Sequence, residues 1–317
     1  MSFLANRPSS IGGDFAARLQ RRLHDTHDWR SGADVSGHFL RAQLRDAIHA
    51  SSFGYKELAN RHPHWVRLLG AALSHVPSIR SRVGCHVRFL QDRCGAKLLD
   101  VGCGNGNFLA AAEKVGWRGT GLEPDPVAAS IAKARGCQVI QGNIEDFHPS
   151  KKAYDAITLD HVLEHLHDAR LVLSKLKAAL ANDGVLVSVT PNPGSLVARI
   201  FGVSWYGLDP PRHLHIPSAS GLTALFHEIG FESRVFTVPR ISRCYASESM
   251  SIRTLGHAHK KSARFIPRLL GMAAQLSTFA GLNFGEEIVC IATKRQSSRS
   301  LGRPIRLKNS TDSASVH

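Results

Sequence analysis

The residues whose types and spacing most clearly predict chemistry lie at 98–109, in the segment LLDVGCGNGNFL. Gly102, Gly104 and Gly106 permit backbone torsions and a close ligand approach that side chains would block. In an open α/β sheet, this turn between a strand and a helix is where nucleotides bind. A carboxylate at Asp100 is poorly suited to a pyrophosphate. It suits a ligand that carries an ammonium group and a cationic sulfur.

Two common phosphate-binding loops do not fit this segment. The dinucleotide fingerprint GxGxxG needs its third glycine one residue after Gly106, where the chain has Asn107. A P-loop needs the sequence GK[ST], which does not follow here. The segment therefore predicts a nucleoside ligand without a bound pyrophosphate.

Strands and helices alternate from Lys97 onward, which predicts a mostly parallel sheet with helices on both faces. The expected strands are Lys97–Val101, Arg118–Glu123, Gln138–Gln141, Asp155–Leu159, Val185–Val189, Phe231–Val238 and Glu286–Thr293. The expected helices are Asn107–Val115, Pro126–Arg135, Val162–Leu180 and Ser220–Ile229, and Asn182-Asp183-Gly184 is a stop signal for the third. The predicted fold is a Rossmann-like seven-stranded α/β fold with a helical N-terminal extension and a helical insert before the last strand.

The glycine segment resembles motif I of the class I S-adenosylmethionine-dependent methyltransferases. The resemblance continues through Glu123, the segment GNIED at 142–146, the segment LDHVLEHL at 159–166 and the closing strands. The segment also resembles a small-molecule subgroup of these enzymes in quinone and glycan pathways. Composition and the pattern of expected elements divide the chain into six parts: a flexible 1–35, a helical extension 36–96, a cofactor-binding core 97–240, an insert or lid 241–284, a last strand 285–294 and a disordered basic tail 295–317.

The resemblance also implies which residues hold S-adenosylmethionine. Asp100, Gly102 and Gly104 would bind the methionine part, with Cys103, Asn105 and Gly106 in the same loop, and Glu123 would accept hydrogen bonds from the ribose. Pro124 and Asp125 would border the adenine, Asn143 and Ile144 would contact it, and Asp160 and His161 would lie beside the sulfonium. Relatives usually have Asp where Asn143 stands, but the Asn carbonyl can also accept a hydrogen bond.

A second group of polar residues follows the fourth expected strand. His161, Glu164 and His165 would share one face at the start of a helix. Some quinone-biosynthesis relatives carry acid and His residues at these positions, so one interpretation is a divalent metal. We expect helix capping and lining of the cofactor pocket instead, and we predict no metal, because the sequence has no separate metal cluster.

The Pro- and Gly-rich segment 191–217 is the expected acceptor side of the site, because loops beyond strand ends carry binding groups. It resembles a segment of the same subgroup in which PxRHLH precedes a helix. His213 is the first candidate for a general base, with Asp209 and His215 second. Trp205, Tyr206 and Arg212 are expected to bind the acceptor, and the alternative is a structural loop held by hydrogen bonds of Arg212 and His215.

The charge is unevenly distributed along the 317 residues. The chain has 40 Lys and Arg and 25 Asp and Glu, a formal net charge of +15. Residues 97–240 are balanced, so the excess lies in the two flanks. A neutral core disfavours nucleic acid as a partner. The basic flanks indicate either solvated surface or contact with a membrane surface.

No leader or spanning segment is visible, so we expect a cytoplasmic protein, with association of the flanks with a membrane as an alternative. The expected activity is methyl transfer from S-adenosylmethionine to a small-molecule, lipid-like or glycan-linked acceptor at oxygen. One alternative is an inactive cofactor-binding scaffold or sensor. Another is an RNA methyltransferase, although no Asn-Pro-Pro-Tyr motif follows the fourth strand. The sequence leaves the oligomeric state open.

Overall fold

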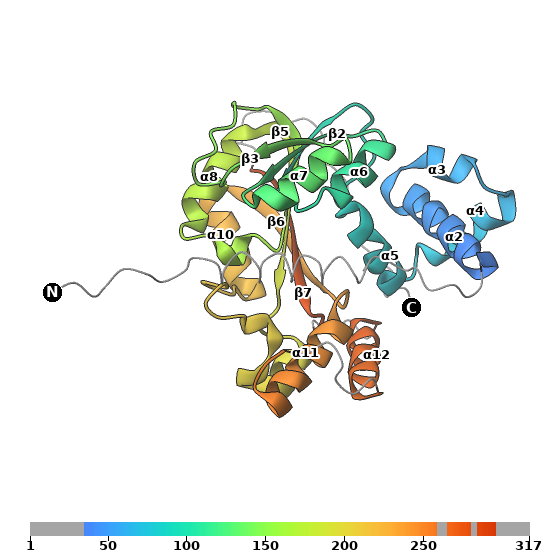
Figure 1. The fold of residues 1–317 in the computed structure, drawn as a ribbon. Helices are drawn as coiled ribbons and strands as arrows, with labels where there is room; N and C mark the ends of the chain where they lie inside the picture. Colours follow the sequence, from blue (N-terminus) through green and yellow to red (C-terminus); the bar gives the residue numbers. More distant parts are fainter. Residues whose placement is uncertain (1–34, 259–264, 280–283, 296–317) are drawn as a thin grey trace, which may run out of the picture.

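A computed structural model describes residues 35–258, 265–279 and 284–295 (Figure 1). Its centre is a seven-stranded sheet in the order β3-β2-β1-β4-β5-β7-β6. The strands are β1 (Lys97–Val101), β2 (Arg118–Glu123), β3 (Gln138–Gln141), β4 (Tyr154–Asp160), β5 (Leu180–Pro191), β6 (Phe231–Val238) and β7 (Glu287–Lys294). Neighbouring strands are parallel except for β7, which runs antiparallel to β5 and β6. The predicted Rossmann-like sheet is therefore confirmed.

Helices cover both faces of the sheet because successive side chains of a strand point to opposite faces. The core helices are α6 (Asn107–Lys114), α7 (Pro126–Ala134), α8 (Ala169–Ala179) and α10 (Ala219–Ile229). On one face, Leu98 of β1 joins a buried cluster with Leu109 of α6 and Ala132 of α7. On the other face, the next residue, Leu99, joins a cluster with residues of α8 and α10 such as Phe226.

The N-terminal extension is helical, as predicted. It consists of α2 (Val35–Phe53), α3 (Lys56–Asn60), α4 (His64–Leu73), α5 (Pro77–Gly84) and the 3-10 turn η1 (Cys85–Val87). Tyr55 ties it to the core, because its hydroxyl donates to the carbonyl of Leu90 and accepts from Nε1 of Trp117, both at 3.1 Å. The flexible start predicted for 1–35 lies outside the described residues except for Val35.

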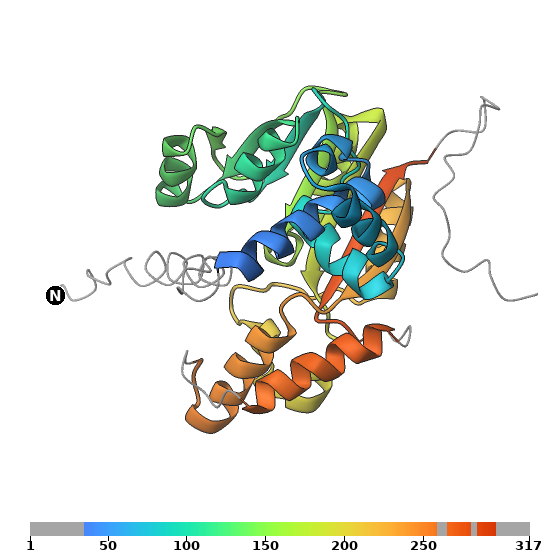
Figure 2. The ribbon, with the colours of Figure 1, turned by 90° about the vertical axis from the view of Figure 1, so that its right-hand side faces the viewer.

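A second lobe lies at the end of β5 and carries the insert. It contains α9 (Leu196–Phe201), the 3-10 turns η3 (Gly202–Ser204) and η4 (Tyr206–Leu208), α11 (Ser242–Leu255) and α12 (Phe265–Phe279). Figures 1 and 2 show α11 and α12 side by side below the sheet. The predicted tail after residue 295 lies outside the described residues, and the six sequence divisions stay predictions.

The long helix predicted over Val162–Leu180 is wrong. The chain forms a 3-10 turn, η2 (Leu163–His165), and α8 begins only after Asp168. The Asp168 carboxylate accepts a hydrogen bond from the backbone N–H of Leu171 at 2.9 Å, so it caps a new helix start. The predicted strand Val185–Val189 is also longer, because β5 begins at Leu180 and includes the expected stop signal at 182–184.

Candidate active site

The crevice of the fold lies where β1 and β4 end side by side, because the chain leaves these two strands in opposite directions along the sheet. A cavity of about 650 Å³ opens there. The predicted cofactor residues that line it are Gly102, Cys103, Gly104, Asn105, Glu123, Pro124, Asp125, Asn143, Ile144, Asp160 and His161. The predicted acceptor-side residues that line it are Tyr206, Asp209, Arg212 and His213. One cavity thus joins both predicted halves of the site.

The glycine loop forms one wall of this cavity. Gly102 has a φ of +67°, and a Cβ atom there would lie 2.6 Å from Cγ2 of Val162. A side chain at this position would therefore strain the backbone and displace Val162, which also lines the cavity. Gly106 does not reach the wall, and a Cβ there would instead lie 2.9 Å from the Cβ of Ala132 in α7. Its role is close packing of the loop against that helix.

Glu123 is held rigidly at the end of β2. Its Oε2 atom accepts a hydrogen bond from the backbone N–H of Gly104 at 2.7 Å, and its Oε1 atom accepts from that of Asp125 at 3.0 Å. Burial raises the pKa of the Glu123 carboxyl, and these two hydrogen bonds oppose the increase. Each carboxylate oxygen keeps a lone pair for a further donor. The geometry suits two ribose hydroxyls.

Asp100 lies beneath the cavity wall instead of on it, and its side chain is fully buried. Its Oδ1 atom accepts a hydrogen bond from the hydroxyl of Thr158 at 2.8 Å and forms an ion pair with Arg88. Its Oδ2 atom has no hydrogen-bond partner among the described residues. Burial raises the pKa of Asp100, whereas the neighbouring guanidinium opposes that effect.

Arg88 is a cavity residue that the sequence analysis missed. It lies in the helical extension, just before β1, and no motif marks it. Its guanidinium stacks on the ring of Phe108, 3.9 Å from the ring centre, and its Nη2 atom lies 3.6 Å from Oδ2 of Asp160. It thereby places a fixed positive charge at the end of β1 and β4, at the cavity wall.

A chain of buried charges continues from Asp160 across the end of the sheet. Nη2 of Arg240 donates to Oδ1 of Asp160 at 2.8 Å and to Oε1 of Glu287 at 2.6 Å. His161 bridges two carboxylates, with Nε2 2.8 Å from Oε1 of Glu287 and Nδ1 3.0 Å from Oε1 of Glu164. Burial alone would lower the pKa of His161, but these two carboxylates raise it to about 10. His161 is therefore an imidazolium at neutral pH.

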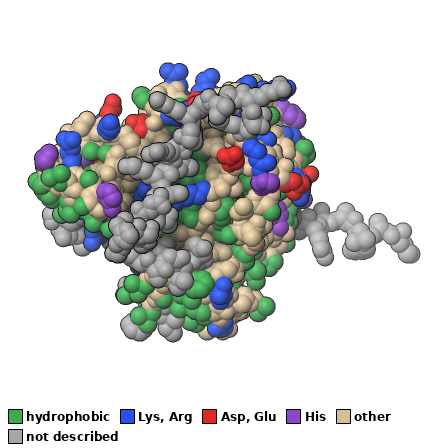
Figure 3. All heavy atoms as spheres, turned by 180° about the vertical axis from the view of Figure 1, so that it is seen from behind, with side chains coloured by type: hydrophobic (Ala, Val, Ile, Leu, Met, Phe, Trp, Pro, Cys, Tyr) green, Lys and Arg blue, Asp and Glu red, His purple; other side chains and the backbone are tan. Residues whose placement is uncertain are grey.

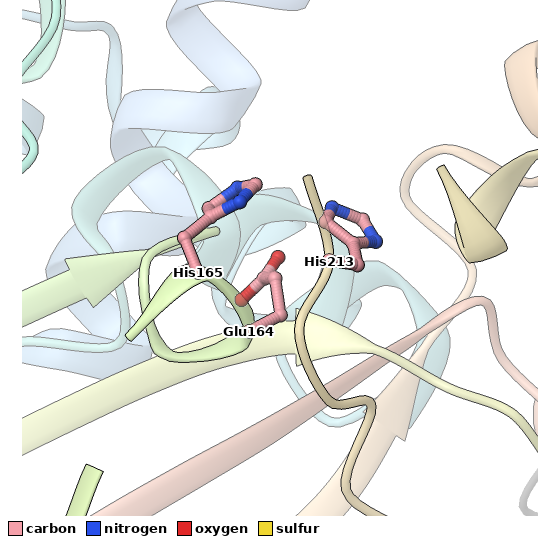
Figure 4. Close-up of side chains that lie close together, drawn as sticks. All are labelled: Glu164, His165 and His213. Atoms are coloured by element: carbon pink, nitrogen blue, oxygen red, sulfur yellow. The ribbon is translucent and has the colours of Figure 1, made fainter. Parts of the chain in front are cut away.

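A pair of histidines, His165 and His213, faces the cavity beside Glu164 (Figure 4). The carbonyl of Gly207 accepts from Nδ1 of His213 at 2.7 Å, and that of Arg212 accepts from Nδ1 of His165 at 2.9 Å. Because a carbonyl can only accept, both rings keep an unprotonated Nε2 when they are neutral. The ring centres are 4.8 Å apart, in an edge-to-face arrangement.

The side chains of Glu164, His165 and His213 each place one possible ligand atom within 4.8 Å of the others. The Oε2 atom of Glu164 is buried without a hydrogen-bond partner among the described residues. Two imidazoles and a carboxylate can accept protons, and they are also a donor set that a divalent cation can use. The sequence-based group differs in one member, because both nitrogens of His161 are occupied by carboxylates. The absence of a metal stays a prediction.

Comparisons with known proteins agree with this geometry. Residues 78–234 match the family model described as a methyltransferase domain. Residues 78–234 are thus a domain of the class I S-adenosylmethionine-dependent methyltransferases. A chain of a Haloferax volcanii complex with the Trm112 methyltransferase activator aligns with a TM-score of 0.50 and 14% identity, covering 80% of this chain and 98% of that chain. This likeness concerns the fold alone.

Two curated relatives are ubiquinone biosynthesis O-methyltransferases. The one from Actinobacillus pleuropneumoniae serotype 7 is 38% identical over 109 residues, which cover 31% of this chain and 47% of the relative. The mitochondrial one from Schizosaccharomyces pombe is 30% identical over 118 residues, which cover 35% of this chain and 43% of the relative. The methyltransferase thus spans about half the length of the curated relatives that it matches.

The cofactor of this family is S-adenosylmethionine, and the residues of the methyltransferase fit it. Gly102, which has no side chain, lets the cofactor approach the backbone of the loop, and Glu123 presents acceptors for the ribose. Arg88 at the wall is a donor for a ligand carboxylate, whereas Asp100 is buried behind it and paired with Arg88, so the predicted direct contact of Asp100 with the cofactor stays a prediction. Bound cofactor supplies a methyl group on a positively charged sulfur, which is already electrophilic.

The acceptor side of the methyltransferase differs in part from the sequence-based expectation. Trp205 is only 3% exposed and packs in a cluster with Phe201 and Tyr245. It is therefore a core residue and does not line the cavity. His215 also lies away from the cavity wall. Tyr245 of α11 does line it, and sequence reasoning missed this residue because the insert carries no motif.

Proposed function

We propose that this methyltransferase moves the methyl group of S-adenosylmethionine to a hydroxyl oxygen of a small acceptor, such as a lipid-like quinone precursor or a glycan-linked intermediate. The observation that carries the proposal is that the cofactor loop and His213 line the same cavity of about 650 Å³. The names of the two curated relatives support oxygen as the acceptor atom and a quinone precursor as the acceptor class.

His213 is the general base in this proposal. Burial lowers the pKa of His213, and the hydrogen bond to Gly207 and the carboxylate of Glu164 oppose this only in part, so the neutral ring is favoured. Its Nδ1–H is held by the carbonyl of Gly207, so Nε2 is the atom that accepts the proton. As the acceptor oxygen forms its bond to the methyl carbon and the carbon–sulfur bond breaks, the hydroxyl proton moves to Nε2.

The other acceptor-side residues have positioning roles. Asp209 forms an ion pair with Arg212 at 3.4 Å, so its carboxylate orients the guanidinium at the cavity wall and is the second candidate for the base. Tyr206 and Tyr245 stand edge to face, with ring centres 5.3 Å apart, and give this end of the cavity an aromatic wall. Such a wall suits a planar acceptor ring, which is held by orientation and by exclusion of water.

The test is the His213→Ala variant with a dihydroxylated aromatic acceptor. We expect turnover to fall by about 10²–10⁴-fold, the range of general base catalysis, while the Kd for S-adenosylmethionine in calorimetry stays within about twofold. The His227→Ala variant, on the exposed surface of α10, is the matched control and should keep full turnover. Unchanged turnover of His213→Ala would remove the base role.

Two further arms separate the alternatives. Turnover that is lost after chelation and restored by a divalent cation would assign the histidine pair to metal binding instead of proton transfer. Cofactor binding without turnover on any hydroxylated acceptor would support the non-catalytic scaffold. Methylation of RNA in preference to small molecules would support the third alternative, although residues 97–240 carry no net charge.

The proposed site of action includes a membrane surface, where a lipid-like acceptor would be found. No described helix is both long and apolar enough to cross a bilayer. Contact would therefore be peripheral and would use the basic flanks. The protein is proposed to act from the cytoplasm.

A further inference from the structure

Helix α4 of the N-terminal extension has two apolar faces, of which only one is covered. The inner face packs on α2 through the buried residues Val66 and Gly70, and a Cβ atom at Gly70 would overlap the Cβ of Ala47. The outer face carries Trp65, Leu68, Leu69 and Ala72. A helix that is apolar on both sides normally has both sides covered.

The outer residues are strongly exposed. Trp65 is 56% exposed, Leu68 59% and Leu69 42%. With Ala72 they follow the spacing i, i+3, i+4 and i+7, so they form one continuous stripe along the helix. We call these four residues the α4 stripe. It lies outside residues 78–234, which match the methyltransferase family model, so the family likeness does not explain it.

The surroundings of the α4 stripe are basic. The chain has no Asp or Glu between Glu57 and Asp92. The exposed arginines in this acid-free segment are Arg61, Arg67, Arg80 and Arg82. Figure 3 shows hydrophobic side chains mixed with basic and His side chains, and a few acidic ones, toward the left edge of the view, where the extension lies.

This combination identifies the occupant by its chemistry. An aromatic residue and leucines on one face of a helix, in a segment that has exposed arginines and no acidic residue, are typical of helices that lie in the interface of an anionic bilayer. A second copy is a poor occupant, because a two-fold contact places the same patch against itself and would bring equal positive charges together. An anionic lipid surface offers both an apolar layer and opposite charge.

We propose that the α4 stripe docks the protein on an anionic lipid bilayer, assisted by the basic segment around it. Trp65, Leu68 and Leu69 enter the interface, and Arg61, which precedes α4, contacts the phosphate groups of the lipids. The proposal rests on the membrane contact of the proposed function and names the surface that makes it. It places the contact on the extension, away from the insert between β6 and β7.

The test is sedimentation of the full chain with vesicles of phosphatidylcholine, with and without phosphatidylglycerol, in the absence of cofactor and acceptor. We expect binding only to the anionic vesicles, weakened by high salt. The double variant Leu68→Gln/Leu69→Gln should bind at least about tenfold less, given the area that two leucines bury. The matched control is Leu171→Gln, a leucine of α8 that is 52% exposed and should bind as the parent does.

Arginine variants and the fluorescence of Trp65 give two further tests of the contact. Arg61→Gln should lower the partition constant by about fivefold and reduce the salt dependence, whereas Arg67→Gln, on the opposite side of α4 from the stripe, should lower it less. The fluorescence of Trp65 should shift to the blue on binding, and Trp65→Phe should abolish the shift. Equal binding of the leucine variant and its control would overturn the proposal, as would a dimer in solution that the leucine variant disrupts. Because no turnover is measured, failure here is distinct from failure of the methyl-transfer proposal.

Discussion

Replacement of Glu287 by Gln tests whether the buried charge chain supports the cofactor site. Glu287 is fully buried and accepts from Arg240 Nε at 2.8 Å, from Arg240 Nη2 at 2.6 Å and from His161 Nε2 at 2.8 Å. Gln keeps the shape but removes the negative charge between two cations. Loss of one partner of a buried ion pair costs about 3–5 kcal/mol, which lowers the Tm by on the order of 10 °C.

The assay is urea and thermal unfolding of the two proteins, together with calorimetry of S-adenosylmethionine binding. We also expect Glu287→Gln to raise the Kd for S-adenosylmethionine by at least about tenfold. Asp160 and His161 line the cavity, and the variant removes the carboxylate that holds His161 and the Arg240 partner of Asp160 in place. Glu228→Gln is the control, since it breaks an ion pair with Arg170 in which both side chains are 57% exposed. Such exposed pairs contribute about 0–1 kcal/mol. A loss for Glu287→Gln no larger than that of the control would refute the reasoning.

Two further predictions follow from the same region. Gly102→Ala should raise the Kd for S-adenosylmethionine by at least about tenfold. The control is Gly95→Ala, at a φ of +78° with nothing within 4 Å of the added Cβ, which should lower the free energy of unfolding by about 1–2 kcal/mol through backbone strain and leave that Kd unchanged. The second concerns pH. Because the folded pKa of His161 is about 10 and its ordinary value is 6.5, the stability that its charge provides is complete below pH 6.5 and is lost as the pH rises toward 10. The free energy of unfolding, measured by urea denaturation, should fall by about 2 kcal/mol between pH 7 and 8.5, and His161→Gln should largely remove this decrease. An equal pH dependence of the unfolding free energy in both proteins would contradict the prediction.

The sheet could be predicted from sequence because its signal is local. The strands Lys97–Val101, Arg118–Glu123, Gln138–Gln141 and Phe231–Val238 have the predicted ends. The prediction of one helix over Val162–Leu180 was wrong, because the helical spacing of apolar residues continues across the gap between η2 and α8. The gap is set by the capping carboxylate of Asp168 and by the tertiary contacts of η2, and the spacing of apolar residues reports neither.

The site divides in the same way. Residues beside strand ends, such as Gly102 and Glu123, could be placed because a strand and the turn after it are continuous in sequence. Arg88 and Tyr245 could not, because they reach the cavity from a helical extension and an insert that have no sequence signal of function. Trp205 shows the opposite error, because an aromatic residue in a polar loop can equally be an anchor of the core.

The buried ion pairs around Asp160 and His161 depend on strands that follow the cofactor motifs in the sequence. Asp160 lies between two guanidiniums, that of Arg88 before β1 and that of Arg240 after β6. His161 is held by Glu287 of β7. Arg240 and Glu287 both lie beyond residue 234, where the family match ends. The cofactor end of β4 therefore acquires its charge balance only when β6 and β7 have joined the sheet, so residues 78–234 alone carry the motifs but not the complete site.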